Sequence, residues 1–172
     1  MLKHDQIEQQ TQLDAHPELP VDPDVVLTRP QVTIHLARTY QLTVFIGGCL
    51  GALTRYTITL LLPTKTDQWP MATFIVNMLG ALALGVLLEG LARSGPDVGL
   101  RRFLRLGIGT GFIGAFTTYS TLAVDADLLV RNGDPVRAGV YTLISVVGGI
   151  LLSALGIWLA GTHHKLRTRQ SI

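Results

Sequence analysis

The chain lacks most of the features that covalent or redox chemistry needs. Cys49 is the single cysteine, so no intrachain disulfide can form. No stretch has the glycine-rich pattern of a phosphate-binding loop. No group of histidines, cysteines and carboxylates gathers within one apolar span. These absences predict a protein that is not an enzyme and that is not coupled to nucleotide hydrolysis.

Charge is also scarce. Charged residues make up 15% of the 172 residues, whereas 48% are hydrophobic. The apolar residues are concentrated in four stretches, 41–62, 70–92, 102–129 and 137–161. Each stretch can cross about 30 Å of hydrocarbon as a helix. The sequence therefore predicts an all-α membrane protein whose four transmembrane helices form one domain, residues 41–161.

Two polar segments flank that domain. Residues 1–40 form an N-terminal arm with several prolines, and its acidic residues are Asp5, Glu8, Asp14, Glu18, Asp22 and Asp24. This composition predicts a disordered acidic arm. The arm lacks a cationic start followed by an apolar core, so we do not interpret it as a cleavable signal. Residues 162–172 are predicted to form a basic C-terminal tail.

The basic residues that flank the four spans favour one side of the membrane. Nine flank one side: Arg29, Arg38, Arg93, Arg101, Arg102, Arg105, Lys165, Arg167 and Arg169. Three flank the other: Lys65, Arg131 and Arg137. Because positive residues are retained in the cytoplasm, this bias predicts a multi-pass protein of the cell membrane with both chain ends inside.

The third span, 102–129, contains the residues least suited to a continuous helix. Its glycines are Gly107, Gly109, Gly111 and Gly114, and hydroxyl residues follow them. Each glycine costs about 1 kcal/mol relative to alanine in a helix. We therefore predict that this helix is broken near the middle of the membrane. Broken backbone there is tolerated only where protein buries it or where it lines a polar cavity, and it presents free carbonyls to ions.

Two other spans carry polar seams with a spacing of four residues, which places each seam on one helix face. The second-span seam is Thr73, Asn77, Ala81, Gly85 and Glu89, and the fourth-span seam is Tyr141, Ser145, Gly149 and Ser153. Asn77 either forms a hydrogen-bonded clasp with another helix or presents its amide donors to a polar path. Glu89 is expected to pair with Arg93. Asp125 is expected to be an interfacial carboxylate.

The first span combines small residues with one cation. Gly47 and Gly51 form a pair that lets another backbone approach closely. Arg55 precedes Pro63 by about 12 Å of helical rise. It either extends to the lipid headgroups or forms an electropositive vestibule that gathers anions.

Four motifs occur in this order: GGCLGALTRY, TFIVNMLGALALG, GIGTGFIGAFTTYST and the pair Tyr141 and Ser145. Together they resemble the Fluc/CrcB family of fluoride channels over residues 44 to about 160. The resemblance implies an antiparallel, dual-topology dimer in the membrane lipid that holds two anion pores. It also implies a structural sodium ion at the dimer interface, bound by the backbone carbonyls of Gly114 and Thr117. Oxygen ligands suit such a hard cation.

The resemblance also implies the residues that line the pore. Asn77, Ser120, Thr121, Tyr141 and Ser145 match the family pattern. Tyr119 and Leu122 occupy two positions where the family has phenylalanine, and Leu122 has no ring edge to offer an anion. Gly149 stands where a hydroxyl residue is usual, so the polar track of the fourth span is incomplete.

The implied function is passive export of cytoplasmic fluoride, which relieves its toxicity. An uncompensated small anion in a low-dielectric passage would cost of order 20 kcal/mol, so short O–H and N–H donors must replace its water. Asn77, Ser120, Thr121, Tyr141 and Ser145 are such donors. No nucleic-acid partner is expected.

Alternatives remain at this point. A proton-coupled antiporter of the small multidrug type also has four spans, but it needs a carboxylate within the membrane, and the first span has none. The strong charge bias conflicts with dual topology, so the dimer is either a homodimer or a heterodimer with an oppositely oriented homologue. In the heterodimer this chain is either a pore-forming subunit or a non-conducting partner.

Overall fold

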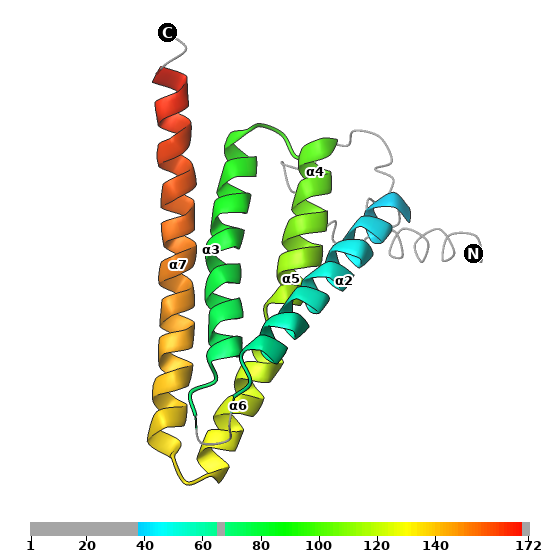
Figure 1. The fold of residues 1–172 in the computed structure, drawn as a ribbon. Coiled ribbons are helices and arrows are strands. Elements are labelled where there is room, and N and C mark those ends of the chain that lie inside the picture. The colour runs from blue at the N-terminus through cyan, green and yellow to red at the C-terminus, as the bar shows by residue number, and fades with distance from the viewer. Residues whose placement is uncertain (1–37, 65–67, 170–172) are drawn as a thin grey trace, which may run out of the picture. The chain divides into compact units, whose positions relative to one another are not determined.

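The computed structural model describes residues 38–64 and 68–169, with side chains as far as Thr162. All regular structure in these ranges is helical (Figure 1). The elements are α2 Arg38–Leu61, α3 Met71–Arg93, α4 Leu100–Leu104, η2 Arg105–Ile113, α5 Gly114–Phe116, α6 Tyr119–Arg131 and α7 Pro135–Arg169. The prediction of an all-α protein is confirmed for this part of the chain.

Three of these helices are long and apolar enough to cross a membrane: Arg38–Leu61, Met71–Arg93 and, within α7, Pro135–Thr162. Large apolar side chains are exposed along them, including Leu61 at 73% and Leu143 at 64%. Such exposure suits a surface that lies in lipid rather than in water. The chain is therefore a multi-pass membrane protein. Its remaining apolar stretch does not form a single continuous helix.

Two boundaries differ from those predicted. Helix α2 begins at Arg38 rather than at residue 41. Helix α7 continues to Arg169, so the segment predicted as a C-terminal tail begins as helix. Residues 1–37 of the acidic arm, Lys65 and residues 170–172 lie outside the described ranges, and the predictions made for them stay predictions.

Helices α3 and α7 lie side by side and run in the same direction, while the segment from α4 to α6 connects them and runs the opposite way, with α4 and α5 on the side of α3 that faces away from α7 (Figure 1). Small residues bring the two helices close together. A Cβ atom built on Gly85 would lie 2.3 Å from the carbonyl oxygen of Ser153. Because Gly85 and Ser153 belong to the two predicted seams, this contact places the seams against each other.

The returning segment contains two irregularities. In η2 the helix widens to the π form, in which each N–H bonds to the carbonyl five residues earlier, as the N–H of Gly114 does to Gly109. The helix is interrupted only later, at Thr117 and Thr118. The predicted break is present, but the prediction that the glycines cause it is wrong. Gly107, Gly109 and Gly111 lie within continuous helix.

Those glycines serve close packing instead. A Cβ atom on Gly47 of α2 would lie 2.1 Å from the carbonyl oxygen of Gly107. A Cβ atom on Gly51 would lie 2.1 Å from the carbonyl oxygen of Phe112. Backbone therefore packs directly on backbone between α2 and η2, and the predicted role of Gly47 and Gly51 is confirmed. This packing offsets the low helix propensity of glycine.

Candidate functional site

The candidate site is centred on the interruption between α5 and α6. Thr117 has φ −80° and ψ 159°, and Thr118 has φ −151° and ψ 123°, so both residues are extended. Thr118 is the N-cap of α6, because its hydroxyl oxygen accepts the N–H of Thr121 at 3.1 Å. The hydroxyl group thus replaces one main-chain partner that the new helix lacks at its start.

Asn77 supplies the other partners. Its Nδ2 donates to the carbonyl oxygen of Thr118 at 2.9 Å, and the N–H of Thr118 donates to its Oδ1 at 2.8 Å. One side-chain amide therefore satisfies both main-chain groups of the residue at the break. Unpaired groups of this kind cost several kcal/mol in hydrocarbon. The hydrogen-bonded clasp, one of the two interpretations of Asn77, is present in the structure.

The same interruption leaves two carbonyls without their helical donors. In a continuous helix the N–H of Thr118 would bond to the carbonyl of Gly114, but it donates to Asn77 instead. The N–H of Thr121 would bond to the carbonyl of Thr117, but it donates to the hydroxyl of Thr118. Gly114 and Thr117 are the two residues whose carbonyls were expected to hold sodium, and the freed oxygens are suitable ligands for a hard cation.

Close packing with α3 accompanies this geometry. A Cβ atom on Gly80, which lies one turn beyond Asn77, would meet the Thr117 methyl group at 2.1 Å. The hydroxyl of Thr117 donates to the carbonyl of Ile113 at 2.9 Å, a bond within its own helical turn. Its side chain is therefore directed to its own helix and to α3.

Hydroxyl groups gather around Thr118. Its Oγ1 lies 3.1 Å from the hydroxyl of Ser120 and 3.0 Å from that of Thr121. Thr118 is buried, whereas Ser120 is exposed and Thr121 is half-buried. The structure thus brings Ser120 and Thr121, both predicted pore residues, to the interruption, where their protons can turn toward an anion.

A cavity of about 190 Å³ lies beside Thr118 and Thr121, two of these hydroxyl residues. Its lining residues come from α2, α3 and the start of α6: Ala52, Arg55, Tyr56, Thr59, Thr73, Val76, Thr118 and Thr121. Among the described residues, no carboxylate lies within ion-pair distance of Arg55. The cavity thus joins an uncompensated cation to hydroxyl donors, an arrangement suited to an anion.

The fourth-span seam contains an unusual buried hydroxyl. Ser145 is only 5% exposed, and its Oγ has no hydrogen-bond partner in the described part of the chain. The nearby Thr142 behaves differently, because it donates to the carbonyl of Ala138 at 2.9 Å. A buried polar group without a partner is costly, and it often marks a place that a water molecule or an ion occupies.

Tyr141 lies one turn before Ser145 and is completely buried. Its hydroxyl donates to Oδ2 of Asp125 at 3.4 Å, a long hydrogen bond between α7 and α6. On the other side of Ser145 the seam has no hydroxyl at Gly149, where an added Cβ atom would lie 3.8 Å from the Met78 methyl group. The predicted gap at Gly149 is therefore lined by the thioether side chain of Met78.

Two predicted pore residues, Tyr119 and Leu122, do not belong to the group of hydroxyls around Thr118. Tyr119 is 81% exposed in the single chain, whereas Leu122 is 7% exposed and belongs to an apolar cluster with Tyr141. Gly114 is also exposed. Their roles in a pore stay predictions.

Asp125 and Thr73 are neighbours of the site that were not predicted from the sequence. Asp125 follows Thr121 by four residues and so shares its helix face, a signal that was available. Thr73 was assigned to a seam without a role, although it lines the cavity of Arg55. The expected pair of Glu89 and Arg93 is confirmed, and it places Glu89 in an exposed ion pair rather than in the site.

A second group of charges lies on the loop between α3 and α4. Asp97 accepts hydrogen bonds from Nε and Nη2 of Arg105 at 3.1 and 2.7 Å, and Arg102 lies 3.6 Å away. The hydrogen bond from Arg105 is the main reason why the pKa of Asp97 is below its usual range. This exposed cluster holds the loop and does not reach the cavity.

Comparison with known proteins places this sequence in a family. The sequence model of a family described as "CrcB-like protein, Camphor Resistance (CrcB)" matches residues 42–157. The chain is 47% identical over 110 residues to fluoride-specific ion channel FluC 1 of Cutibacterium acnes, which covers 64% of this chain and 77% of that protein. It is 41% identical over 119 residues to fluoride-specific ion channel FluC 1 of Ligilactobacillus salivarius, which covers 69% of this chain and 97% of that protein.

Proposed function

Because this chain belongs to the CrcB-like family, we propose that it is a passive fluoride channel of the cell membrane. It lets fluoride that has accumulated in the cytoplasm leave the cell and so relieves its toxicity. Fluoride is a small anion with firmly held water, so a conducting path must offer donors in place of that water.

The observation that carries this proposal is the junction of the interrupted helix with the cavity of Arg55. Thr118 is fixed by Asn77 at the interruption, and the hydroxyls of Thr118 and Thr121 open into the cavity. Arg55 raises the local concentration of anions, and the hydroxyls replace their water. The cavity is therefore the vestibule of the proposed path.

Beyond the vestibule, the path follows the two seams. Asn77 uses one Nδ2 hydrogen for Thr118 and has a second to offer an anion. Ser120 and Thr121 provide hydroxyls at the interruption, and Ser145 provides its unpartnered hydroxyl. Tyr141 completes the donor set when its proton turns away from Asp125. Tyr119 is exposed, so its ring reaches a pore only where a second subunit covers it.

The proposed assembly is an antiparallel, dual-topology dimer in which the segment from α4 to α6 forms the fourth crossing of each chain. A structural sodium ion binds at the dimer interface through the carbonyls of Gly114 and Thr117. The diversion of the N–H groups of Thr118 and Thr121 supports this site, because it frees both oxygens. The partner is either a second copy or an oppositely oriented homologue.

A passive channel differs from a proton-coupled antiporter, which needs a carboxylate within the membrane. Glu89 is paired with Arg93 at the end of α3, away from the cavity. Asp125 is half-buried and accepts a hydrogen bond from Tyr141, so it is the carboxylate that an antiporter would have to use. If the chain were an antiporter, neutralising Asp125 would abolish transport and the dependence of transport on a proton gradient.

The test is fluoride efflux from liposomes that contain the purified chain, followed with a fluoride electrode. We expect efflux without a proton gradient, and we expect Asn77→Asp to reduce it more than tenfold, because the new charge repels the anion and removes the donor to Thr118. Asn132→Asp adds the same charge at the exposed end of α6 and is the control.

Three results would contradict the proposal. Wild-type protein that releases no fluoride, alone or with a homologue, would favour the non-conducting role. Efflux that requires a proton gradient would favour the antiporter. Unchanged efflux in Asn77→Asp, with the control also unchanged, would remove Asn77 from the path.

A further inference from the structure

A groove lies beside the close contact between α2 and η2, and we call it the α2–η2 groove. Its volume is about 560 Å³, within the range of about 300–1,000 Å³ that ligand pockets have. Among the described residues it is lined by Tyr40, Gln41, Val44 and Phe45 of α2 and by Arg105, Leu106 and Thr110 of η2. The glycines that join the two helices do not line it, and it shares no lining residue with the cavity of Arg55.

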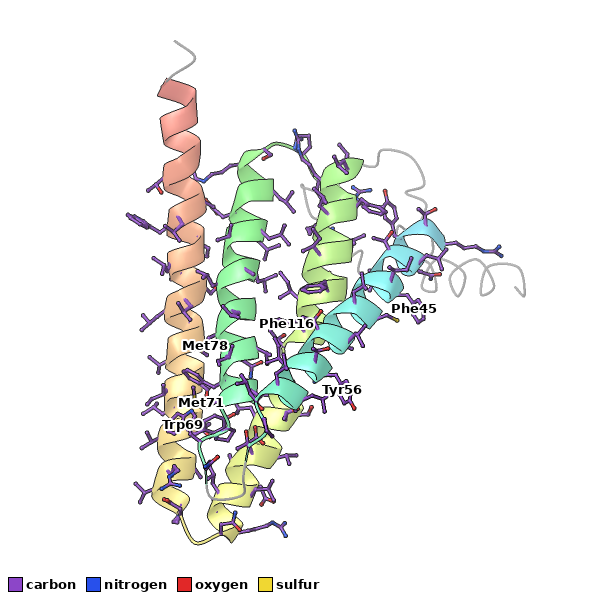
Figure 2. The ribbon with its side chains drawn as sticks, viewed as in Figure 1. Phe45, Tyr56, Trp69, Met71, Met78 and Phe116 are labelled. Atoms are coloured by element: carbon purple, nitrogen blue, oxygen red, sulfur yellow. The ribbon has the colours of Figure 1, made fainter. Side chains whose placement is uncertain are left out.

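The α2–η2 groove is polar at the membrane surface and apolar further in. Helix α2 and the segment that contains η2 start at the same end of the helices (Figure 1). Tyr40 and Arg105 lie at that end, whereas Phe45 lies more than one turn deeper along α2. Phe45 is 67% exposed, and Figure 2 shows it on the side of α2 that faces away from α3. A phospholipid has the same order, with a charged headgroup at the surface and an acyl chain below it.

Arg105 is the cation of this groove. Its Nε and Nη2 donate to Oδ2 of Asp97 at 3.1 and 2.7 Å. A guanidinium has five N–H donors, so the two hydrogens of Nη1 remain for another acceptor. The side chain of Arg105 is 40% exposed. Because paired arginine donors suit phosphate oxygens, Arg105 can bind a lipid phosphate while it stays bonded to Asp97.

The surroundings of the groove carry more positive than negative charge. The other charged residues described at this end are the arginines Arg38, Arg93, Arg101 and Arg102 and the carboxylates Glu89 and Asp97. Arg101 donates to a neutral group, the carbonyl of Pro96, at 3.3 Å. Cations beside a transmembrane helix attract anionic lipid headgroups. The excess therefore favours an anionic over a zwitterionic phospholipid.

We propose that the α2–η2 groove binds one anionic phospholipid. The phosphate contacts Arg105, and the acyl chain lies along Val44 and Phe45. Tyr40 lies at the level of the headgroups, where amphipathic rings are favoured. The lipid touches both helices and so adds to the contact that holds them together. The site does not depend on which ion the protein transports.

A second cavity shows why the charge matters. The cavity between α6 and α7 is larger, about 650 Å³, and its lining is also mostly apolar. Its one charged lining residue among the described residues is Asp127, a carboxylate that repels a lipid phosphate. We therefore assign the anionic lipid to the α2–η2 groove.

Quenching of tryptophan fluorescence by brominated lipids tests the site, because bromine on an acyl chain quenches a ring that it touches. The full-length chain has two tryptophans, so Phe45→Trp with Trp69→Phe and Trp158→Phe leaves one emitter, in the groove. We call this protein the groove variant. It is placed in liposomes of phosphatidylglycerol, which is anionic, and phosphatidylcholine, which is zwitterionic, with either lipid brominated. We expect about fivefold tighter binding of phosphatidylglycerol.

Trp69→Phe alone provides the control for ordinary contact with lipid. It leaves Trp158, which is 62% exposed on α7. Trp158 lies near the same end of the helices, because a Cβ atom on the nearby Gly161 would lie 3.2 Å from Nη2 of Arg93. Both brominated lipids should quench it about equally.

Charge variants of the groove variant identify the headgroup contact. Arg105→Gln should remove most of the preference for phosphatidylglycerol, and Arg105→Lys should retain part of it. Asp97→Asn should raise the preference, because it releases Arg105 from its carboxylate, and it keeps the test decisive if Arg105→Gln does not fold. Arg93→Gln is the matched control, since Arg93 lies at the same end but does not line the groove.

Three results would overturn the proposal. The first is equal binding of the two lipids in the groove variant. The second is an equal loss of preference in Arg93→Gln and Arg105→Gln, because the attraction would then belong to the whole surface. The third is a groove variant that neither lipid quenches although both quench Trp158, because protein, such as a second copy of the chain, would then cover the groove. These measurements need no fluoride flux, so failure of the proposed channel function leaves them unaffected.

Discussion

The returning segment, α4 to α6, touches α2 and α3 in opposite ways. Against α2 it packs through glycines, and the carbonyl oxygens of Gly107 and Phe112 occupy the space where side chains of Gly47 and Gly51 would be. Against α3 it is held by a polar side chain, the amide of Asn77 on Thr118. The first contact leaves no room for a ligand and fixes the helix. The second leaves donors beside a cavity, so it can serve function.

The largest effect is expected where backbone packs on backbone. Gly51→Ala places a methyl group against the Phe112 carbonyl, so α2 and η2 must separate, at a cost of about 1–3 kcal/mol in the free energy of unfolding. Thermal unfolding of the purified protein measures this loss. Gly90→Ala is the control, since no atom lies within 4 Å of the added Cβ. Equal stability of the two variants would mean that the close approach is not needed.

A smaller effect is expected at the interruption itself. Thr118→Val removes the N-cap of α6 and its contacts with the hydroxyls of Ser120 and Thr121, at a cost of about 0.5–2 kcal/mol in stability. Fluoride efflux should fall with it, because the hydroxyl cluster is lost. Thr118→Ser keeps the oxygen and should retain both properties. If valine is tolerated as well as serine in both measurements, the cap does not organise the site.

The smallest change in stability is expected at the unpartnered hydroxyl. Ser145→Ala removes a buried group that has no hydrogen-bond partner among the described residues, so the free energy of unfolding should change by no more than about 1 kcal/mol. Efflux should nevertheless fall, because a donor of the path is lost. Ser153→Ala, two turns further along the same seam, is the control. A large loss of stability without a loss of flux would make Ser145 a structural residue.

Much of the helical architecture could be predicted from the sequence, because apolar length and polar spacing are local signals. The helical spans, the small residues at 47 and 51, the seams of α3 and α7 and the pair of Glu89 and Arg93 follow from such patterns. The position of the helix interruption does not follow from such patterns. Glycine propensity favoured residues 107–114, but these residues are helical, and Gly107 and Gly111 pack closely against α2.

The residue types of the site could be predicted from the sequence, but the contacts between these residues could be predicted less well. Asn77 was identified as a polar residue within a span, yet its partner lies 41 positions away in the sequence. Asp125 was not assigned to the site, although its spacing from Thr121 was a local signal, because its contact with Tyr141 joins residues 16 positions apart. Tyr119 was assigned to the pore from its place in a motif, and in the single chain it is exposed.

The sequence by itself determined that the chain is helical, enters the membrane several times and contains one segment that cannot remain a regular helix throughout. The tertiary structure alone decided that the interruption falls at Thr118, because there a neighbouring helix supplies an amide that bonds both main-chain groups. Helix propensity acts within a few residues along the chain, whereas the partners of a broken backbone are found across space.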